Sequence, residues 1–389
     1  MSSPLRDVRI LFVLPSLGLG GAERQAFLLA RHLLLEERAA VRLISFTRFD
    51  TLAAQCEAIG LPYEFFDFTH KYQSRTGHIV DALRFIRLVR RRRAQILMPY
   101  CMFQNVLCGL TWRAGGARVC IWNQRDEGRS RMGRWVEAIA LHQTPRYISN
   151  STHGAGFLTD TLQVASDRVT VVHNGIDLSS SAAPPREWRT ELGIPANAFV
   201  ACMVANLHFK KDHATLLSAW RTVVDRLEPS VAPAHLLLAG AAGDARDAIV
   251  QQIADLSLGG RVHLLGEVRD VAGLFRHVDV SVFSSFAEGI PNAVLESMSA
   301  GLAVVATDYP GIREAVGTVG APWLVRPRDP HDLAERILLA AANPEQRAEL
   351  GRAGQERVRT QFSVAAMTAG MTRIVLEEWQ RRGGRGVAD

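Results

Sequence analysis

Two glutamates in the stretch FAEGIPNAVLESMSAG (286–301) have a residue type and a spacing that could do chemistry. Glu288 stands beside Gly289, and Glu296 follows inside an apolar run after seven intervening residues. Two carboxylates held close together are good acceptors for the hydroxyl groups of a sugar or a ribose. The pattern fits an ordinary helix start equally well, with one acid favoured by the helix dipole and the other in a salt bridge. Both interpretations stay open on these residues alone.

The backbone between the two acids is predicted to open a helix. The strand candidate DVSVFSS (279–285) ends just before this loop, and Pro291 suits the first helical turn. Backbone N–H groups of Ile290, Asn292 and Ala293 would then face an anion, because a helix N-terminus carries about half a positive charge. The first acid accordingly lies in the loop, and the second lies in the helix.

A pair of lysines follows a second strand candidate, in the stretch VANLHFKKDHATLL (204–217). Lys210 and Lys211 fall in the loop, and Asp212 is predicted to cap the next helix. A lysine at the carboxyl end of a parallel strand can neutralise a diphosphate as a point charge. The alternative is a solvated lysine pair without a ligand.

A glycine-rich loop, PSLGLGGAERQ (15–25), follows the first strand candidate. Gly18, Gly20 and Gly21 precede a helix that carries Glu23 in its first turn. Such a loop lets backbone N–H groups approach a phosphate. The spacing completes neither a dinucleotide fingerprint nor a Walker motif. Contact with a phosphate or substrate and a tight turn with an acid at the helix dipole therefore remain equally supported.

These motifs are embedded in alternating strand and helix candidates. The strand candidates are short and rich in valine and leucine: VRILFVLP, AVRLISF, RVTVVHNG, AFVACMVANL, AHLLLAG, RVHLLGE, DVSVFSS and LAVVATD. This alternation predicts parallel sheets with helices on both faces, an α/β class in which ligands bind at the carboxyl ends of the strands.

The length of 389 residues predicts two domains. The linker LSSSAAPPREW (178–188) separates two series of strand and helix candidates. We therefore predict a lobe over 1–180, a second lobe over 188–365, and a last helical segment over 366–389 that packs back on the first lobe. The two doubly wound lobes are expected to face a central cleft.

Composition excludes some classes of protein. Hydrophobic residues make up 48% of the chain and charged residues 22%, which is typical of a globular protein. The five cysteines form no C-x-x-C pair, so reduced thiols in a cytoplasmic protein are expected. The uncharged span 94–112 contains polar residues and a proline, which favours a buried strand and helix over a membrane span. A net charge of +6 suits acidic small molecules or anionic lipid, and nucleic acid is the least favoured partner.

Taken together, the motifs resemble the retaining glycosyltransferases of family 4, which have the GT-B fold of two Rossmann-like lobes. The matching pieces run in order along nearly the whole chain: GLGGAER, VVHNGID, VANLHFKKDHATLL, and the segment 262–316 with its E-x7-E element. The resemblance implies that the first lobe binds the acceptor and the second binds a nucleoside-diphosphate-sugar, with UDP or GDP as the nucleotide.

The resemblance also implies roles for individual residues. Glu288 would hold hydroxyls of the donor sugar, Glu296 would hold the ribose, and Lys211 would neutralise the departing diphosphate. Catalysis would rest on Glu288 and Lys211. The donor would contact Gly20, Gly21, Asn206, Lys211, Glu288, Gly289, Ile290, Asn292, Ala293 and Glu296. The first-lobe glycines would close over the donor phosphates or the acceptor. Attack would occur on the same face as departure, with no metal and no cofactor, in keeping with the absence of an Asp-x-Asp motif.

Two departures from the family pattern affect these roles. Asn206 stands where many members have an arginine, so Lys210 or His208 would have to compensate. Many members also have a first-lobe histidine near the sugar, which the segment ILMPYCMFQN lacks.

Substitutes for that histidine come from two segments of the first lobe. We expect Tyr100 or Gln104 in its place, and Arg125 or Asp126 as a contact of the acceptor. A structural salt bridge in the loop is an equal alternative for the last two residues.

The acceptor is expected to be a glycan or a lipid-linked saccharide, in cell-surface polysaccharide or glycoconjugate biosynthesis. The stretch DALRFIRLVRRRR (81–93) aligns Leu83, Ile86 and either Val89 or Arg90 along a helix that becomes very basic. It could rest on anionic lipid at the inner face of the cytoplasmic membrane, or be a half-buried helix with a solvated arginine face. The alternative functions are a nucleotide-sugar epimerase on the same fold and a non-catalytic sugar-nucleotide-binding subunit.

Overall fold

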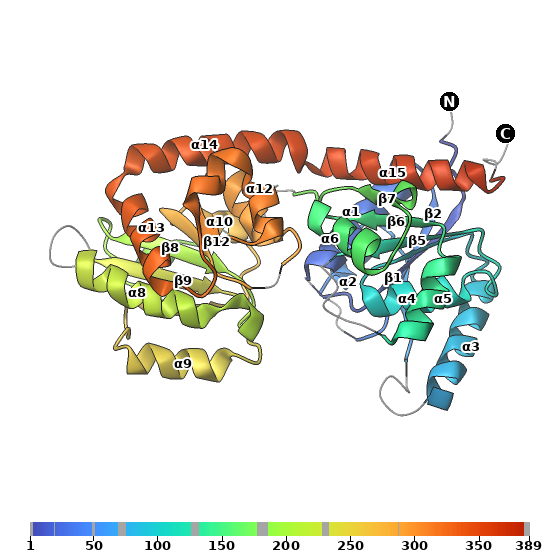
Figure 1. Ribbon diagram of the computed structural model, residues 1–389, viewed down its shortest axis with the longest axis horizontal. Coiled ribbons are helices and arrows are strands. Elements are labelled where there is room, and N and C mark those ends of the chain that lie inside the picture. The colour runs from blue at the N-terminus through green and yellow to red at the C-terminus, as the bar shows by residue number, and fades with distance from the viewer. Residues whose placement is uncertain are drawn as a thin grey trace. The chain divides into compact units, whose positions relative to one another are not determined.

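The computed structural model describes residues 3–18, 20–48, 51–68, 75–125, 132–176, 186–227, 233–286 and 288–384 (Figure 1). It divides into two compact units: Met1–Gly175 with Val364–Asp389, and Ile176–Ser363. The division thus falls a few residues before the predicted ends of the two lobes. Most of the predicted linker, residues 177–185, lies outside the described residues.

The first unit is built on a seven-stranded sheet with the order β3-β2-β1-β4-β5-β6-β7. All neighbouring strands are parallel. The strands are β1 (Arg9–Leu14), β2 (Ala40–Ser45), β3 (Tyr63–Phe65), β4 (Ile96–Pro99), β5 (Val119–Gln124), β6 (Arg146–Ser149) and β7 (Val169–Val171). The strand order reverses between β1 and β4, which is where ligands bind in open α/β sheets.

Helices cover both faces of this sheet. The helices α1 (Gly21–Leu35), α2 (Ala53–Ala58) and α15 (Val364–Arg381) contribute to one core cluster. On the other face lie α3 (Arg75–Arg91), α4 (Met102–Thr111) and α5 (Arg134–Gln143), followed by α6 (Thr152–Gly156). Burial on both faces explains the nearly continuous apolar strand sequences.

The last helix, α15, belongs to the first unit although it ends the described chain. Met367, Met371, Ile374 and Trp379 are all buried in the same cluster as the apolar side chains of α1. Burial of these four side chains removes enough apolar surface from water to hold the helix in place.

The second unit is built on a six-stranded parallel sheet with the order β10-β9-β8-β11-β12-β13. The strands are β8 (Phe199–Val204), β9 (Ala234–Ala239), β10 (Val262–Gly266), β11 (Val280–Phe283), β12 (Val304–Thr307) and β13 (Leu324–Val325). The order reverses between β8 and β11.

Eight helices of the described chain belong to this unit. They are α7 (Trp188–Glu191), α8 (His213–Leu227), α9 (Arg246–Asp255), α10 (Val271–Phe275), α11 (Asn292–Ser299), α12 (Pro310–Gly320), α13 (Pro330–Ala342) and α14 (Pro344–Gln361). The main core cluster joins one face of β8 and β9, together with β11 and β12, to α8, α11, α12 and α13. The other face of β8 and β9 belongs to a second cluster.

The predicted fold class, with two doubly wound parallel lobes, is confirmed. The uncharged span 94–112 is the buried strand β4 followed by α4, as predicted. Within the described residues, no helix has both the length and the hydropathy needed to cross a bilayer.

Two glycines of α14, Gly351 and Gly354, differ in how closely the neighbouring chain approaches them. A Cβ atom on Gly351 would lie 1.9 Å from the carbonyl oxygen of Gly301, which is far inside van der Waals contact. A Cβ atom on Gly354 would lie 3.4 Å from the nearest atoms of Met298, an ordinary packing distance. Gly351 therefore permits a close backbone approach, whereas Gly354 does not need to be glycine.

These two positions predict opposite effects of the same substitution. Gly354→Ala should raise the free energy of unfolding by about 0.5–1 kcal/mol, because alanine loses less backbone entropy in a helix. Gly351→Ala should lower it by about 1–3 kcal/mol through overpacking against Gly301. Denaturant unfolding of both variants measures the difference. Equal effects of the two substitutions would contradict the described packing of α14.

Candidate functional site

The predicted donor-site residues of the second unit gather at the carboxyl ends of β8 and β11. The loop after β8 carries Lys211, and the loop after β11 carries Glu288. In the strand order, β9 lies next to β8 toward one edge of the sheet, and β12 lies next to β11 toward the opposite edge. The two loops therefore diverge from the switch point, the position at which parallel sheets bind ligands.

Lys211 and Glu288 form an ion pair between Nζ and Oε1. The glutamate side chain is only 8% exposed and that of the lysine 26%. Ser285 Oγ lies 2.9 Å from the same carboxylate oxygen and 3.0 Å from the carbonyl oxygen of Lys210. The sequence thus placed both residues at this edge, and the structure brings their charged groups into contact.

Hydrogen bonds join the two loops and the next strand. The amide of Phe286 donates to Lys210 O at 3.3 Å. Thr307, the last residue of β12, accepts from the Ser285 amide at 3.1 Å and donates to the Ser285 carbonyl oxygen at 2.7 Å. Because Ser285 and Thr307 are fully buried, these bonds fix the backbone just before Glu288.

The backbone around Lys211 has an unusual conformation. Asp212 has φ of 43°, in the left-handed region that aspartate tolerates better than most residues. Its Oδ1 accepts from the amide of Thr215 at 3.4 Å, which is the N-cap contact that the sequence predicted. Before it, His208 Nδ1 accepts from the Lys210 amide at 3.3 Å. Lys211 therefore extends from a short turn that is held at both ends.

The helix after Glu288 begins one residue later than predicted. Pro291 has extended backbone angles and precedes α11, which starts at Asn292. Glu296 lies on this helix and is 3% exposed. A Cβ on Gly311 of α12 would lie 1.7 Å from the Gly289 carbonyl oxygen, so glycine is required for α12 to approach this loop.

Asn206 also lies at this edge of the sheet. It is exposed, and its Oδ1 accepts from the amide of Ala241 at 3.1 Å. A Cβ on Gly240 would lie 2.0 Å from the Ala205 carbonyl oxygen, so the loops after β8 and β9 touch through their backbones. The described contact of Asn206 thus positions a loop.

In the first unit, Gly20 and Gly21 lie at the N-terminus of α1 beside Glu23. A Cβ on Gly20 would lie 2.2 Å from the carboxylate of Glu23, and Ser16 Oγ donates to that carboxylate at 3.0 Å. Burial raises the pKa of Glu23, while hydrogen bonds from its own amide and from Ser16 oppose this shift. The glycine-rich loop thus makes a tight turn with an acid beside the helix N-terminus, and its contact with a phosphate or substrate stays a prediction.

Tyr100 and Arg125 meet at the carboxyl ends of β4 and β5. The Arg125 guanidinium carbon lies 4.6 Å from the centroid of the Tyr100 ring. The guanidinium donates to Asn174 Oδ1 at 3.3 Å and to Asn123 Oδ1 at 3.2 Å. Within the described chain its partners are amide oxygens, and no carboxylate pairs with it. Asp126 lies outside the described residues.

The remaining histidine substitute, Gln104, is 3% exposed on α4. Tyr100 is fully buried, and its hydroxyl has no hydrogen-bond partner within the described chain. Burial raises the pKa of this hydroxyl, and the positive charge of Arg125 partly offsets the increase. The structure therefore brings Tyr100 and Arg125 together as an aromatic ring and a cation.

Sequence reasoning missed Ser285, Thr307, Gly311 and His213. No spacing pattern marks the first three, since their partners are distant in sequence. His213 follows Lys211 closely, is 2% exposed, and has no hydrogen-bond partner for either ring nitrogen within the described residues. Burial, with a smaller effect of the Lys211 charge, lowers its pKa to about 4.

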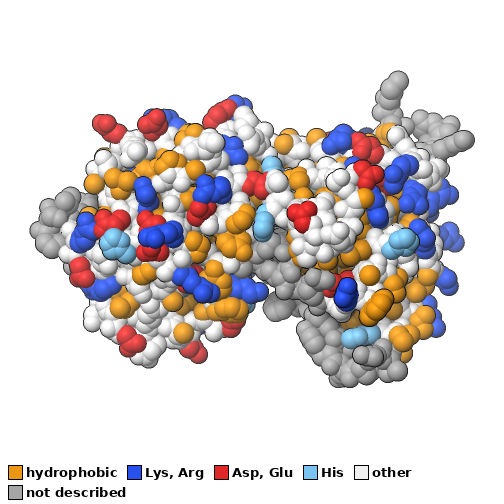
Figure 2. Space-filling view, in the orientation of Figure 1, with side chains coloured by type: hydrophobic (Ala, Val, Ile, Leu, Met, Phe, Trp, Pro, Cys, Tyr) orange, Lys and Arg blue, Asp and Glu red, His pale blue; other side chains and the backbone are white. Residues whose placement is uncertain are grey.

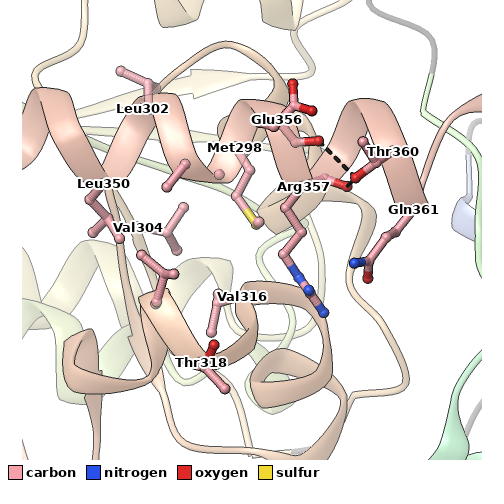
Figure 3. Close-up of a pocket in the computed structure, with 14 residues that line it drawn as sticks. Met298, Leu302, Val304, Val316, Thr318, Leu350, Glu356, Arg357, Thr360 and Gln361 are labelled. Carbon is pink, nitrogen blue, oxygen red and sulfur yellow. Dashed lines mark hydrogen bonds between the residues drawn. The ribbon is translucent and has the colours of Figure 1, made fainter.

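A cavity of about 230 Å³ lies elsewhere in the second unit, near the C-terminal end of α11 (Figure 3). Its apolar lining includes Met298, Leu302, Val304 and Leu350. Arg357 borders the cavity and donates to the backbone carbonyl oxygens of Glu314 and Ala315 in α12. None of the predicted site residues lines this cavity. In the described part of the chain, no group of three or more acidic, histidine or cysteine side chains is arranged to hold a metal ion.

Solved structures define the class of fold. Anabaena Alr3699/HepE in complex with UDP and glucose matches with a TM-score of 0.81 and 19% identity, over 95% of this chain and 100% of that chain. The sucrose-phosphate synthase from Thermosynechococcus elongatus matches with a TM-score of 0.76 and 18% identity, over 96% of this chain and 100% of that chain. These similarities show that the protein has the GT-B fold.

Family models then identify the type of enzyme. Residues 19–180 match the model described as Glycosyltransferase Family 4, and residues 185–357 match Glycosyl transferases group 1. The chain is therefore a glycosyltransferase with the GT-B fold.

Curated relatives match this chain over part of their length. The alpha-maltose-1-phosphate synthase of Mycolicibacterium smegmatis is 30% identical over 61% of this chain and 64% of its own length. An Escherichia coli relative is named UDP-Gal:alpha-D-GlcNAc-diphosphoundecaprenol alpha-1,3-galactosyltransferase and is 27% identical over 46% of both chains. The chain thus spans about half to two thirds of the length of these relatives.

The buried His213 predicts that the protein loses stability in acid. The folded pKa is about 4 and the ordinary value 6.5, so the unfolded chain takes up the proton first as the pH falls. Stability is complete above pH 6.5 and decreases toward pH 4, by at most about 3 kcal/mol for this residue.

Urea unfolding of the wild type and His213→Leu at about pH 7 and about pH 4.5 measures this effect. The variant should lose less stability between the two pH values. It should retain part of the loss, because burial and neighbouring positive charges also lower the pKa of His235 to about 4. Identical losses in both proteins would show that His213 is not buried as a neutral imidazole.

Proposed function

We propose that this protein is a retaining glycosyltransferase that moves a sugar from a UDP- or GDP-sugar to a saccharide or lipid-linked acceptor. The observation that carries the proposal is the Lys211–Glu288 ion pair at the switch point of the second sheet. It unites a cation for the diphosphate and a carboxylate for the sugar hydroxyls within one contact. A role in cell-surface polysaccharide or glycoconjugate biosynthesis follows from the proposed acceptor.

The ion pair suits a donor that carries both charge and hydroxyl groups. Without a ligand, Lys211 and Glu288 neutralise each other. A bound donor would place its diphosphate against the Lys211 ammonium and its sugar hydroxyls against the Glu288 carboxylate. Lys211 would then stabilise the negative charge that grows on the diphosphate as the glycosidic bond breaks.

The rest of the donor site would be formed by α11 and its preceding loop. The backbone N–H groups of Gly289, Ile290, Asn292 and Ala293 lie near the positive end of this helix, which favours a phosphate. The carboxylate of Glu296 would accept from the ribose hydroxyls. Asn206 would border the same site.

The resemblance also assigns Gly20 and Gly21 to the donor phosphates. The described contacts support the tight turn more strongly, because the Glu23 carboxylate already lies beside Gly20. A phosphate would have to compete with this carboxylate for the helix N-terminus.

Retention of the anomeric configuration would follow from attack on the face that the diphosphate leaves. The acceptor hydroxyl oxygen bonds to the anomeric carbon as the bond from that carbon to the diphosphate oxygen breaks. The departing phosphate oxygen takes the acceptor proton, so no separate base is needed.

The relatives and structural neighbours are consistent with the proposed substrates. The name of the Escherichia coli relative specifies a UDP-sugar donor and a diphosphoundecaprenol-linked acceptor. The HepE structure holds UDP and glucose on the same fold. A lipid-linked acceptor would bring this protein to the cytoplasmic face of a membrane. Tyr100 and Arg125 would contact the acceptor in the first unit.

Lys211 should be essential, and its neighbour Lys210 offers a matched control. Lys211→Ala and Glu288→Gln should each lower transfer at least roughly a hundredfold, because each removes a group that acts on the transition state. Lys210→Ala should have a much smaller effect, since its ammonium lies 5.9 Å from the Phe209 ring centroid and forms no described ion pair. Transfer is measured from a panel of UDP-, GDP- and ADP-sugars.

Donor binding is followed separately by thermal unfolding. A donor at about a hundred times its Kd stabilises the folded protein by about 2.7 kcal/mol, and Lys211→Ala should lose most of this shift. Full activity of both site variants would disprove the assignment. NMR analysis of the products distinguishes retention from inversion, and conversion of the donor without an acceptor would indicate an epimerase.

Arg125 should affect the acceptor and leave the donor unaffected. Arg125→Ala is expected to raise the acceptor KM roughly tenfold, because it removes a cation held by neutral amide oxygens. The donor-induced thermal shift should not change, since Arg125 belongs to the first unit. Tyr100→Phe keeps the ring beneath the guanidinium and therefore tests the Tyr100 hydroxyl separately from Arg125. An unchanged acceptor KM in Arg125→Ala would remove this residue from the site.

A further inference from the structure

Among the side chains of α3 and α5 that the structure describes, the exposed ones are of two kinds, apolar and basic. On α5 they are Arg134, Trp135, Val136, Ala138, Ile139 and His142. On α3, from residue 77 onward, they are His78, Ile79, Val80, Leu83, Arg87, Arg90 and Arg91. We call these residues the apolar–basic face. Figure 2 shows hydrophobic and cationic side chains over this part of the first unit.

Large apolar side chains are unusually exposed here. Trp135 is 83% exposed, Ile79 61%, Ile139 51% and Leu83 48%. The other six tryptophans of the chain are each at most 4% exposed. A solvent-exposed tryptophan beside isoleucine and leucine marks a surface that gains free energy when it is covered.

The acids of these two helices are turned inward. Asp81 is fully buried and pairs with Arg84 at 2.7 Å. Glu137 is 1% exposed and accepts from the amide of Met132. Of the exposed arginines, Arg91 pairs with Glu64 of β3 at 3.7 Å, whereas Arg87, Arg90 and Arg134 form no ion pair within the described chain.

The face lies toward the same edge of the sheet as the proposed acceptor residues. The helices α3, α4 and α5 pack on one face of the first sheet. Each connects two parallel strands, so its N-terminal half lies near the carboxyl ends of the strands. Most apolar members of the face occupy these N-terminal halves, and Ile139 lies just past the middle of α5. Tyr100 and Arg125 follow the carboxyl ends of β4 and β5.

The sequence predicted a lipid contact for residues 81–93 alone. Of the expected stripe, Leu83 is exposed, but Val89 is fully buried against α4 and the sheet. The C-terminal half of α3 therefore contributes arginines only. The apolar part of the surface comes from the first half of α3 and from α5, which the sequence did not indicate.

We infer that the apolar–basic face docks on an anionic lipid bilayer. Trp135, Ile139 and Ile79 would enter the headgroup region, while the arginines of both helices would pair with anionic headgroups. A second copy of this chain is a poorer occupant, because its identical face would bring like charges together. The inference rests on the proposed function for its purpose: a bilayer docked here would present a lipid-linked acceptor near Tyr100 and Arg125.

Tryptophan fluorescence tests this contact directly, since Trp135 is the exposed tryptophan. The full chain is mixed with vesicles of phosphatidylcholine, or of phosphatidylcholine with phosphatidylglycerol, whose acyl chains carry bromine as a quencher. The anionic vesicles should quench the wild type and leave Trp135→Phe unquenched. Quenching should weaken as salt is added, because ions screen the headgroup charge.

Co-sedimentation with the same anionic vesicles measures binding. Trp135→Ser with Ile139→Ser should weaken it roughly tenfold or more through lost apolar burial. Arg87→Glu with Arg134→Glu should weaken it by a similar factor through charge reversal. Val250→Ser with Leu339→Ser is the matched control: both residues are exposed apolar side chains of the second unit, and binding should not change.

Three results would overturn the inference: no binding of the wild type to anionic vesicles, unchanged binding of the Trp135 and Ile139 variant, or quenching that persists in Trp135→Phe. If the double variant Trp135→Ser with Ile139→Ser has a lower molar mass than the wild type in light scattering and binds vesicles equally well, the face joins two copies of the chain. No donor is present in these experiments, so they are independent of catalysis. Vesicle binding without transfer would end only the proposed function, and transfer to a soluble acceptor without vesicle binding would end only this inference.

Discussion

The ion pair between Lys211 and Glu288 is the interaction on which the second unit's site depends. Both groups are largely removed from water, so each would be an uncompensated charge without the other. Removal of one partner of a buried pair costs about 3–5 kcal/mol in proteins where it has been measured. The loops that carry Lys211 and Glu288 must therefore be held in fixed positions relative to each other. Ser285 and Thr307 help to fix this position, because their hydrogen bonds join the backbone before Glu288 to the end of β12.

Stability alone does not account for this pair. A well-packed pair of apolar side chains would hold two loops as firmly as a buried ion pair does. The charges are instead located at the switch point of a parallel sheet, the position at which such sheets bind ligands. A diphosphate-sugar contains an anion and hydroxyl groups, so it could replace both halves of the pair without leaving a charge uncompensated.

The first turns of two helices show how sequence decides whether a helix N-terminus is left for a ligand. In α1, Glu23 folds back over Gly20 and supplies the negative charge itself. The first turn of α11 contains no acid, and Pro291 before it has no side-chain acceptor. Both loops contain glycine and both precede a helix, but only the second precedes a helix whose first turn has no acid. This difference is visible in the sequence once the helix start is known.

Sequence patterns predicted what depends on local order, and missed what depends on distant contacts. Apolar runs gave the strands, and positions after strand ends placed Lys211 and Glu288 at one edge. Their direct contact could not be predicted, because it requires the register between β8 and β11. The close approach of Gly311 to Gly289 and the inward orientation of Val89 likewise depend on tertiary packing.

The charges of the first unit differ from those of the second in a way that bears on the acceptor. Arg125 is held by amide oxygens of Asn123 and Asn174, which fix its position without neutralising it. Within the described chain, Arg87, Arg90 and Arg134 of α3 and α5 likewise form no ion pair, while Arg91 pairs with Glu64. A cation that is positioned but not neutralised attracts a negative group. An acceptor attached to its lipid through phosphate would satisfy both features, because the headgroup phosphates would meet the helices while the acceptor's own phosphate approached Arg125. A neutral soluble sugar would use neither, so the electrostatics of the first unit favour the lipid-linked acceptor.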